Sequence, residues 1–285
     1  MSENSLDVVL SGNERKNLGQ GLPSYPCVPP SKGCDNMKFT INGNKLKEYI
    51  ESALLKGKWN YGQVNKTTTL NSSIIISISD EPFICNGDHS SYVKTKIQIE
   101  DEFEKGRVTL DTDMLLKYLR NDNCTFTLKD NTLTLLSGTR KVTMPVLDRH
   151  QYNDAILDVN KNYVPHNDMK KSLKISNRTE LKTRVKVASS ELTEALKACE
   201  VVGNSTYKLD YDGEKLIVSS NTDNENIAVD VTVMESFGPK ATMEFSAPIH
   251  KYLGNVSTIL SYNDDSPLSV ICGGFTMLRA PRVAQ

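Results

Sequence analysis

Few residues of this sequence combine the types and the spacing that catalysis requires. Cys272-Gly273-Gly274 has the residue types of a nucleophile turn, but the nearest histidine, His250, follows no spacing rule that would make it the base. The adjacent acids Asp264 and Asp265 are more typical of a solvated hairpin tip than of a cation site. The sequence has no Gly-rich phosphate loop, no H-E-x-x-H motif and no G-x-S-x-G motif. We therefore expect a protein that is not an enzyme and that holds no cofactor.

The cysteines form neither a metal-binding pattern nor a disulfide pattern. No two of the six make a C-x-x-C pair, and only four histidines are present to complete a zinc site. A disulfide framework is not expected in a reducing compartment. We expect most of the cysteines to be small buried hydrophobic residues; they are Cys27, Cys34, Cys85, Cys124, Cys199 and Cys272.

The composition indicates a folded protein of about two domains. The chain has 285 residues, of which 38% are hydrophobic. The net charge of −1 excludes a generally polycationic nucleic-acid binder, but it permits positive charge gathered on one face. No apolar run is long enough for a membrane span, and residues 1–33 lack the blocks of a signal peptide. The expected location is therefore the cytoplasm.

Apolar periodicity predicts the elements of the first half. Residues 1–36 have no apolar period and are expected to be a flexible leader. After a strand at Lys38–Ile41, the apolar residues from Leu46 to Leu54 fall on one face of a helix that Asn44 can cap. Strands are expected at 73–79, 82–85, 91–99 and 107–110, then a short helix at 113–120, then strands at 124–128, 133–136 and 141–146.

The second half restarts the pattern after a polar linker, residues 148–180. The linker holds one apolar cluster, Ala155-Ile156-Leu157. Three further residues would either bind a partner or anchor the linker; they are Tyr152, Tyr163 and Pro165. A helix capped by Ser190 follows the strand at 181–188. Strands are expected at 207–211, 215–219, 227–233 and 243–245, then a short helix at 248–253, then strands at 259–262, 268–271 and 276–278.

The recurrence of this order indicates an internal duplication. Lys117-Tyr118-Leu119 recurs as Lys251-Tyr252-Leu253, each in a short helix after a strand. Met144-Pro145-Val146 closes the first unit and residues 280–283 close the second. The predicted domains are therefore 37–147 and 181–285, joined by the linker.

Several passages, in their order, resemble the two-domain DNA sliding clamps, typified by proliferating cell nuclear antigen and the archaeal clamps. Residues 86–93 resemble the segment in which an acidic residue and a serine precede an outward strand. Residues 245–253 resemble the short helix of the second domain, and residues 264–268 and 278–283 resemble the C-terminal hairpin and tail. The resemblance covers residues 37–283 and is closer in the second half, whereas residues 56–70 are longer than the family needs and the leader has no counterpart.

The resemblance implies an α+β, duplicated sliding-clamp (DNA clamp) fold. Each domain would hold two β-α-β-β-β units, with the helices inside and the sheets outside. Three chains would form a homotrimeric ring around duplex DNA and act as a polymerase processivity factor. The implied partners are double-stranded DNA, bound without sequence specificity, DNA polymerase and other clients with clamp-binding peptides, a clamp loader and further copies of the chain, but no membrane. The implied location is the nucleoid or replication site, the nucleus in a eukaryote, or a viral factory.

The resemblance also implies that basic side chains of the helices face the central hole, where they meet phosphates without reading bases. They lie off the apolar stripes of their helices, which an ordinary solvated face would also explain. Acids on the same helices, such as Glu48 and Glu194, predict a modest field and a mobile grip. The candidate DNA-facing residues are Lys45, Lys47, Lys117, Arg120, Lys197, His250 and Lys251.

A client peptide would insert into an apolar pocket between the linker and the C-terminal domain. Tyr92 and Val93 would supply one wall, and Ile156 and Leu157 would supply the lid. The floor would consist of Pro267, Leu278, Ala280 and Pro281, although Pro267 and Leu278 are also explained as ordinary core or turn residues.

Two other classes of function compete with a ring-shaped clamp. One is a clamp-fold processivity, transcription or repair scaffold protein that never closes a ring. The other is a hydrolase on a β-rich scaffold, which the motifs disfavour. A ring needs open strand edges that pair between subunits, and we expect these around 107–110, or a neighbouring strand, and around 207–211.

Overall fold

The structure is a computed structural model, and it describes residues 36–54, 73–87, 90–147, 159, 161–176, 179–202, 206–222, 224–246 and 249–282. The leader up to residue 35, the long segment 56–70 and the apolar linker cluster Ala155-Ile156-Leu157 lie outside the described residues.

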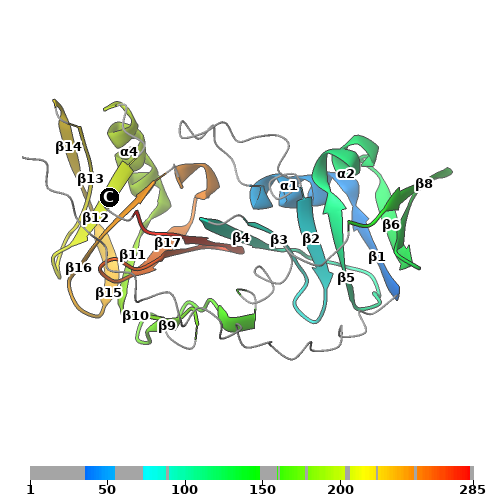
Figure 1. The fold of residues 1–285 in the computed structure, drawn as a ribbon, viewed down its shortest axis with the longest axis horizontal. Coiled ribbons are helices and arrows are strands. Elements are labelled where there is room, and N and C mark those ends of the chain that lie inside the picture. Colours follow the sequence, from blue (N-terminus) through cyan, green and yellow to red (C-terminus); the bar gives the residue numbers. More distant parts are fainter. Residues whose placement is uncertain are drawn as a thin grey trace, which may run out of the picture. The chain divides into compact units, whose positions relative to one another are not determined.

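The first half follows the predicted order of elements, with boundaries that differ by a few residues (Figure 1). Its elements are β1 (Asn36–Asn42), α1 (Gly43–Ala53), β2 (Ser73–Ile78), β3 (Phe83–Gly87), β4 (Ser91–Lys96), β5 (Gly106–Asp111), α2 (Thr112–Tyr118), β6 (Asn123–Lys129), β7 (Thr132–Ser137) and β8 (Arg140–Pro145).

The second half repeats this order after two short strands of the linker, β9 (Leu173–Lys174) and β10 (Glu180–Leu181). Its elements are β11 (Thr183–Ala188), α4 (Ser189–Glu200), β12 (Thr206–Tyr211), β13 (Leu216–Asn221), β14 (Asn226–Val231), β15 (Val233–Phe237), β16 (Ala241–Ser246), the 3-10 helix η1 (His250–Tyr252), β17 (Ser257–Tyr262), β18 (Leu268–Cys272) and β19 (Phe275–Arg279). The strand expected at 227–233 is divided, because the Thr232 N–H between β14 and β15 donates to Glu191 Oε2 (2.9 Å).

The strands form two four-stranded sheets, one nine-stranded sheet and the small β10-β9 pair. The four-stranded sheets have the orders β1-β6-β7-β8 and β14-β13-β12-β16. The nine-stranded sheet has the order β15-β11-β17-β18-β19-β4-β3-β2-β5, so it takes strands from both halves. The expected edge at 107–110 lies in β5, which ends this sheet. The expected edge at 207–211 was wrong, because β12 lies between β13 and β16.

Both long helices begin where their strand ends, and this placement corrects the two expected caps. The Asn42 side chain caps α1 by accepting from the Asn44 and Lys45 N–H groups, so Asn44 lies inside the helix. Ala188 precedes α4 without any side-chain cap, and Ser190 lies in the first turn. The apolar stripes were predicted correctly, because Leu46, Ile50 and Ala53 of α1 are buried, as are Leu192, Ala195, Leu196 and Cys199 of α4.

An apolar core lies in each half of the chain. In the first half, Phe39 of β1 stacks on Phe126 of β6 with 4.7 Å between ring centroids. In the second half, Tyr207 of β12 stacks on Phe245 of β16 at 5.3 Å. The four cysteines that the structure describes are buried and free, as predicted: Cys85, Cys124, Cys199 and Cys272. No helix in the described part of the chain is long and apolar enough to cross a membrane.

The duplication is visible at equivalent points of the two halves. Leu119 follows α2 and Leu253 follows η1 as the capping residue, so the repeated Lys-Tyr-Leu tripeptide ends a short helix both times. Gly138 and Gly273, in the turns before β8 and β19, have φ of 56° and 58°. A side chain is disfavoured in this left-handed conformation, so the two turns share the same need for glycine.

Candidate functional site: the helical layer and the linker junction

Six of the seven candidate DNA-facing residues are exposed on or next to the helices. Lys45 and Lys47 lie on α1, Lys117 lies on α2 with Arg120 just after it, and Lys197 and Lys251 lie on α4 and η1. Their exposure leaves them accessible to a ligand.

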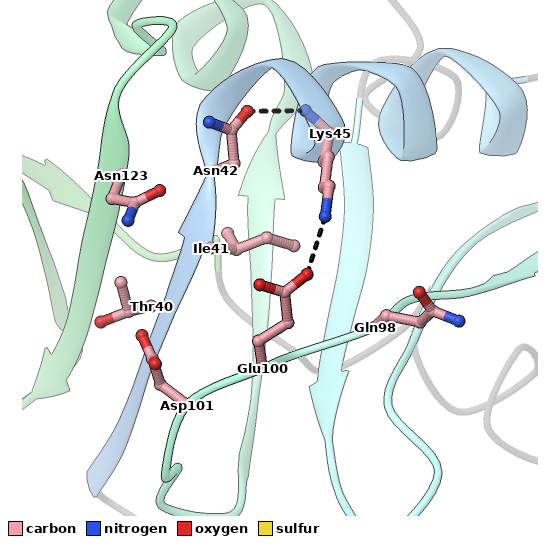
Figure 2. Close-up of a pocket in the computed structure, with 8 residues that line it drawn as sticks. All are labelled: Thr40, Ile41, Asn42, Lys45, Gln98, Glu100, Asp101 and Asn123. Carbon is pink, nitrogen blue, oxygen red and sulfur yellow. Dashed lines mark hydrogen bonds and ion pairs between the residues drawn. The ribbon is translucent and has the colours of Figure 1, made fainter.

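Lys45 has an acidic partner in the same chain. Its Nζ donates to Glu100 Oε1 at 2.8 Å, across a small polar pocket that lies beside β1 under the start of α1 (Figure 2). This hydrogen bond raises the pKa of Lys45 and lowers that of Glu100. Asp101 and Asn123 also line the pocket. Lys45 is therefore paired with a carboxylate of its own chain, in an exposed contact that water screens.

Two other cations have weaker local partners. Lys47 lies 4.0 Å from Glu51 of the next helical turn. Lys117 Nζ lies 5.6 Å from the centroid of the Tyr118 ring. Both contacts are exposed and yield readily to water or phosphate, so these two side chains remain usable for an electrostatic grip.

His250, the seventh candidate DNA-facing residue, differs from the other six because its side chain is largely buried. Its side chain is 8% exposed and lies against α4, with Nδ1 3.5 Å from Glu200 Oε1. The Tyr207 hydroxyl donates to the same carboxylate oxygen at 3.1 Å. Burial lowers the pKa of His250, against the attraction of Glu200 and with help from Lys251 and Lys197. The imidazole is therefore a largely buried, neutral group that joins η1 to α4.

The exposed charges of the helical layer balance. The six cations named above are accompanied by six exposed carboxylates: Glu48, Glu51, Asp113, Glu191, Glu194 and Glu200. With His250 neutral, these twelve exposed side chains carry no net charge. Such a layer attracts phosphate only through local spacing of charges, which agrees with the modest field expected from the sequence.

The linker packs onto the nine-stranded sheet where the two halves meet. Tyr163 of the linker is 2% exposed, and its hydroxyl lies 2.5 Å from Ser269 Oγ of β18. Its ring meets Tyr92 of β4 edge-on, with 6.4 Å between centroids. Met169 and Leu173 of the linker join the same apolar cluster. Tyr163 therefore anchors the linker, which is one of the two roles that the sequence left open.

The structure separates the expected pocket residues into two groups. Tyr92 and Val93 are 4% and 0% exposed, and Val93 belongs to the core of the second half. Val93 therefore cannot form a pocket wall in this conformation, because its side chain packs inward; Tyr92 is covered by the linker. The half-buried residues that stay accessible are Pro267, Leu278, Ala280 and Pro281. Ile156 and Leu157 lie outside the described residues.

The C-terminal segment continues from β19 as an extended chain. The Ala280 N–H donates to Ser90 O at 2.8 Å, and the Arg282 N–H donates to Glu244 O of β16 at 2.8 Å. Pro281 lies between these two bonds and offers no donor of its own. The half-buried apolar residues of this segment are thus held against strands of both halves.

Arg184 is a site residue that the sequence analysis missed. It lies on β11 with 0% exposure, and its guanidinium donates to the backbone oxygens of His166, Asp168 and Lys171 in the linker. It also donates to His166 Nδ1 at 3.1 Å and to Ser261 Oγ at 3.1 Å. Burial lowers the pKa of Arg184, but the guanidinium stays charged at any physiological pH. An arginine in a predicted strand carries no sequence signal for such a role, because most of its partners are backbone atoms.

Comparisons with known structures agree with this topology. A. fulgidus PCNA, solved with the C-terminal region of FEN-1, matches at a TM-score of 0.61 and 17% identity, over 87% of this chain and 99% of that chain. PCNA from Thermococcus kodakaraensis matches at 0.58 and 14%, over 86% and 100%. The DNA polymerase sliding clamp of Pseudomonas aeruginosa matches at 0.64 and 13%, over 90% and 68%.

No family model and no curated protein matches the chain. The likeness therefore rests on structure, and it spans nearly the whole of the two archaeal chains and about two thirds of the bacterial one. The order of strands and helices and these likenesses together show that the chain has the α+β fold of the DNA sliding clamps, as the resemblance in its sequence predicted.

Proposed function

We propose that the chain is the subunit of a DNA sliding clamp, a non-enzymatic processivity factor. Three copies close a ring around duplex DNA, and client proteins, among them a DNA polymerase, bind by short peptides beside the linker. A loader opens the ring to admit DNA at replication sites. The clamp fold supports this proposal, and one feature of the chain's own strand pairing carries it.

That feature is the way the chain joins its two halves. β19 of the second half pairs with β4 of the first, and Met277 lies opposite Val93. The two side chains are 2% and 0% exposed, because both belong to the apolar core of the second half, which continues across the junction onto β4. The edge of β19 and the edge of β4 therefore pair with each other inside one chain.

β8 is the equivalent of β19 in the first half, and β14 is the equivalent of β4 in the second half. The outer edges of β8 and β14 are open within the chain. β8 ends its sheet and follows the same left-handed glycine turn as β19. β14 also ends its sheet, and it is the third strand after α4, as β4 is the third strand after α1. A second copy can therefore repeat the internal junction by placing its β14 beside β8 of the first copy.

The pairing registers within each half indicate which residues would meet. Val142 holds the position of Met277, and Ile227 holds that of Val93. Both are half-buried and pack at the rims of their cores. We expect Val142 to lie opposite the partner subunit's Ile227, with both side chains buried. Since the two edges differ, the contact is head-to-tail and repeats until a ring closes.

Sedimentation of the full chain at micromolar concentration tests this assembly. The parent should have three times the mass of one chain, whereas Val142→Glu and Ile227→Glu should each sediment as a single chain, because a buried unpaired carboxylate opposes the contact. Ile217→Glu is the matched control, since Ile217 is half-buried on the central strand β13 and should leave the trimer intact. A monomeric parent, or edge variants as large as the parent, would contradict the ring.

The balanced charge of the helical layer favours a second candidate function. A clamp-fold scaffold that never surrounds DNA needs no positive inner face, and it would recruit transcription or repair proteins through the same linker region. The same sedimentation experiment separates the two, because a scaffold of this kind remains a monomer or a dimer.

A further inference from the structure

Arg184 makes four hydrogen bonds to the linker. Nη1 donates to Asp168 O at 2.6 Å and to Lys171 O at 3.0 Å, and Nη2 donates to His166 O at 2.7 Å. Hydrogen bonds from a charged donor are stronger than those between neutral groups. One guanidinium on β11 therefore binds the linker backbone at three positions between residues 166 and 171.

The His166 ring also contacts Arg184, and it links Arg184 to the next part of the linker. Because a guanidinium has no acceptor, His166 Nδ1 accepts from Arg184 Nη1, and Nε2 lies 3.2 Å from Ser172 O, to which it donates. The ring thus connects Arg184 to the strand β9, which begins at Leu173. Earlier in the linker, the Tyr163 hydroxyl is hydrogen-bonded to Ser269. The described linker is consequently ordered from Tyr163 to Leu173 by one buried cation and one tyrosine.

The fold itself does not require this cation. Lys38 occupies the position on β1 that Arg184 occupies on β11, and Lys38 is exposed. A buried guanidinium costs free energy unless its hydrogen bonds are satisfied. A core residue at position 184 would avoid that cost, so the placement of an arginine here is best explained by what it holds.

We propose that Arg184 is a positioning residue for client binding, which holds the linker in the shape that receives a client peptide. This inference rests on the proposed function, because it takes the linker as one side of the peptide site. Arg184 itself lies under the linker and is not expected to touch the peptide.

Two measurements on the full-length chain test the inference. Hydrogen exchange reports the opening of the linker amides between 161 and 176, and calorimetry reports the affinity for a peptide of the Gln-x-x-aliphatic-x-x-aromatic-aromatic type. Arg184→Met keeps the apolar stem and removes the guanidinium. It should speed linker exchange at least about ten-fold and weaken peptide binding by about five-fold or more. The amides of β17–β19 should exchange as in the parent.

Arg184→Lys and Lys186→Met are the matched variants. Lysine keeps the charge but offers one ammonium in place of a planar fork, so it should restore part of both losses. Lys186 lies two residues further along β11 and pairs with Glu235 (3.8 Å), so Lys186→Met should change neither measurement. If Arg184→Met does not fold, Arg184→Lys carries the test through intermediate exchange and intermediate affinity.

The outcomes separate this inference from the proposed function. If the parent binds the peptide and the Arg184 variants bind it equally well, Arg184 is only a structural residue and the inference is wrong. Unchanged linker exchange in both Arg184 variants would overturn it as well. A parent that does not bind the peptide would contradict the client-binding part of the proposed function and this inference together.

Discussion

The hydroxyls of Tyr163 and Ser269 lie 2.5 Å apart, and this contact ties the linker to the middle of the nine-stranded sheet. Ser269 lies opposite Leu278 in the β18–β19 pair, and Leu278 lies opposite Tyr92 across the junction between the halves. Tyr163 therefore rests on the place where the two halves of the chain meet. A change at Tyr163 tests how much the linker contributes to the stability of that junction.

Replacing Tyr163 by phenylalanine should lower the free energy of unfolding by about 1 kcal/mol, the usual net value of one hydrogen bond. Replacing it by alanine should cost about 3–5 kcal/mol, because a buried aromatic ring is lost as well. Chemical denaturation followed by circular dichroism measures both. Tyr49→Phe is the control, since no hydrogen bond of the Tyr49 hydroxyl is described, and it should leave the midpoint unchanged. Equal midpoints for Tyr163→Phe and the parent would show that the contact contributes nothing.

Reversing the charge of Lys117, Lys197 and Lys251 together should weaken DNA loading or processive synthesis. The layer has no net charge in the parent, so three lysine-to-glutamate changes make it acidic and repel the phosphates. The loss should shrink as salt rises. The fold should survive, since exposed charges contribute little to stability. Primer extension with the cognate polymerase, over a range of salt, measures the effect.

The control for this prediction reverses three exposed lysines outside the helices and the linker: Lys38, Lys129 and Lys240. This second variant has the same net charge as the first but should support synthesis like the parent. If both triple variants lose activity equally, total charge and not the helical layer is responsible. If the helical variant matches the parent at low salt, these residues do not face DNA.

Acid should destabilise the contact between η1 and α4. Burial holds the pKa of His250 below its ordinary value of about 6.5, so the unfolded chain binds the proton more readily than the folded chain. The neutral ring therefore contributes stability above that ordinary value, and the contribution is lost as pH falls from it through the lower pKa of the folded chain. Urea midpoints at successive pH values between neutral and mildly acidic should fall more steeply for the parent than for His250→Gln. Lys129→Gln, which changes an exposed lysine of β6 outside η1 and α4, should follow the parent, and identical slopes in all three would contradict the prediction.

Changing Ile156 and Leu157 to serine should weaken client binding while leaving assembly intact. Each side chain would lose apolar contact of about 1–3 kcal/mol, which corresponds to a fall in affinity of about ten-fold or more. Calorimetry with the same peptide type measures the change, and sedimentation checks the ring. Unchanged affinity in the double variant, with normal binding by the parent, would place the client site away from the apolar cluster of the linker.

Local patterns in the sequence determined most of the elements. The spacing of Leu46, Ile50 and Ala53 was enough to predict α1, because a helix buries residues three and four apart. The recurring Lys-Tyr-Leu tripeptide correctly indicated two equivalent short helices. Alternation along the chain predicted strands such as β6 and β12, which bury every second residue, whereas continuous apolar runs marked strands such as β2 and β18, which are buried throughout. These signals are local, so a single sequence carries them.

The tertiary structure decided the features that depend on distant partners. His250 lies beside Lys251 in the sequence, yet packing against Glu200 makes it a largely buried neutral group. The predicted strand at β12 gave no sign of whether it lies inside its sheet, because pairing with β13 and β16 is set by register across the whole half. Arg184 became a linker anchor only when the fold brought backbone oxygens of residues 166–171 to it. Backbone oxygens are common to every residue type, so no pattern of side chains reveals where the chain will gather them.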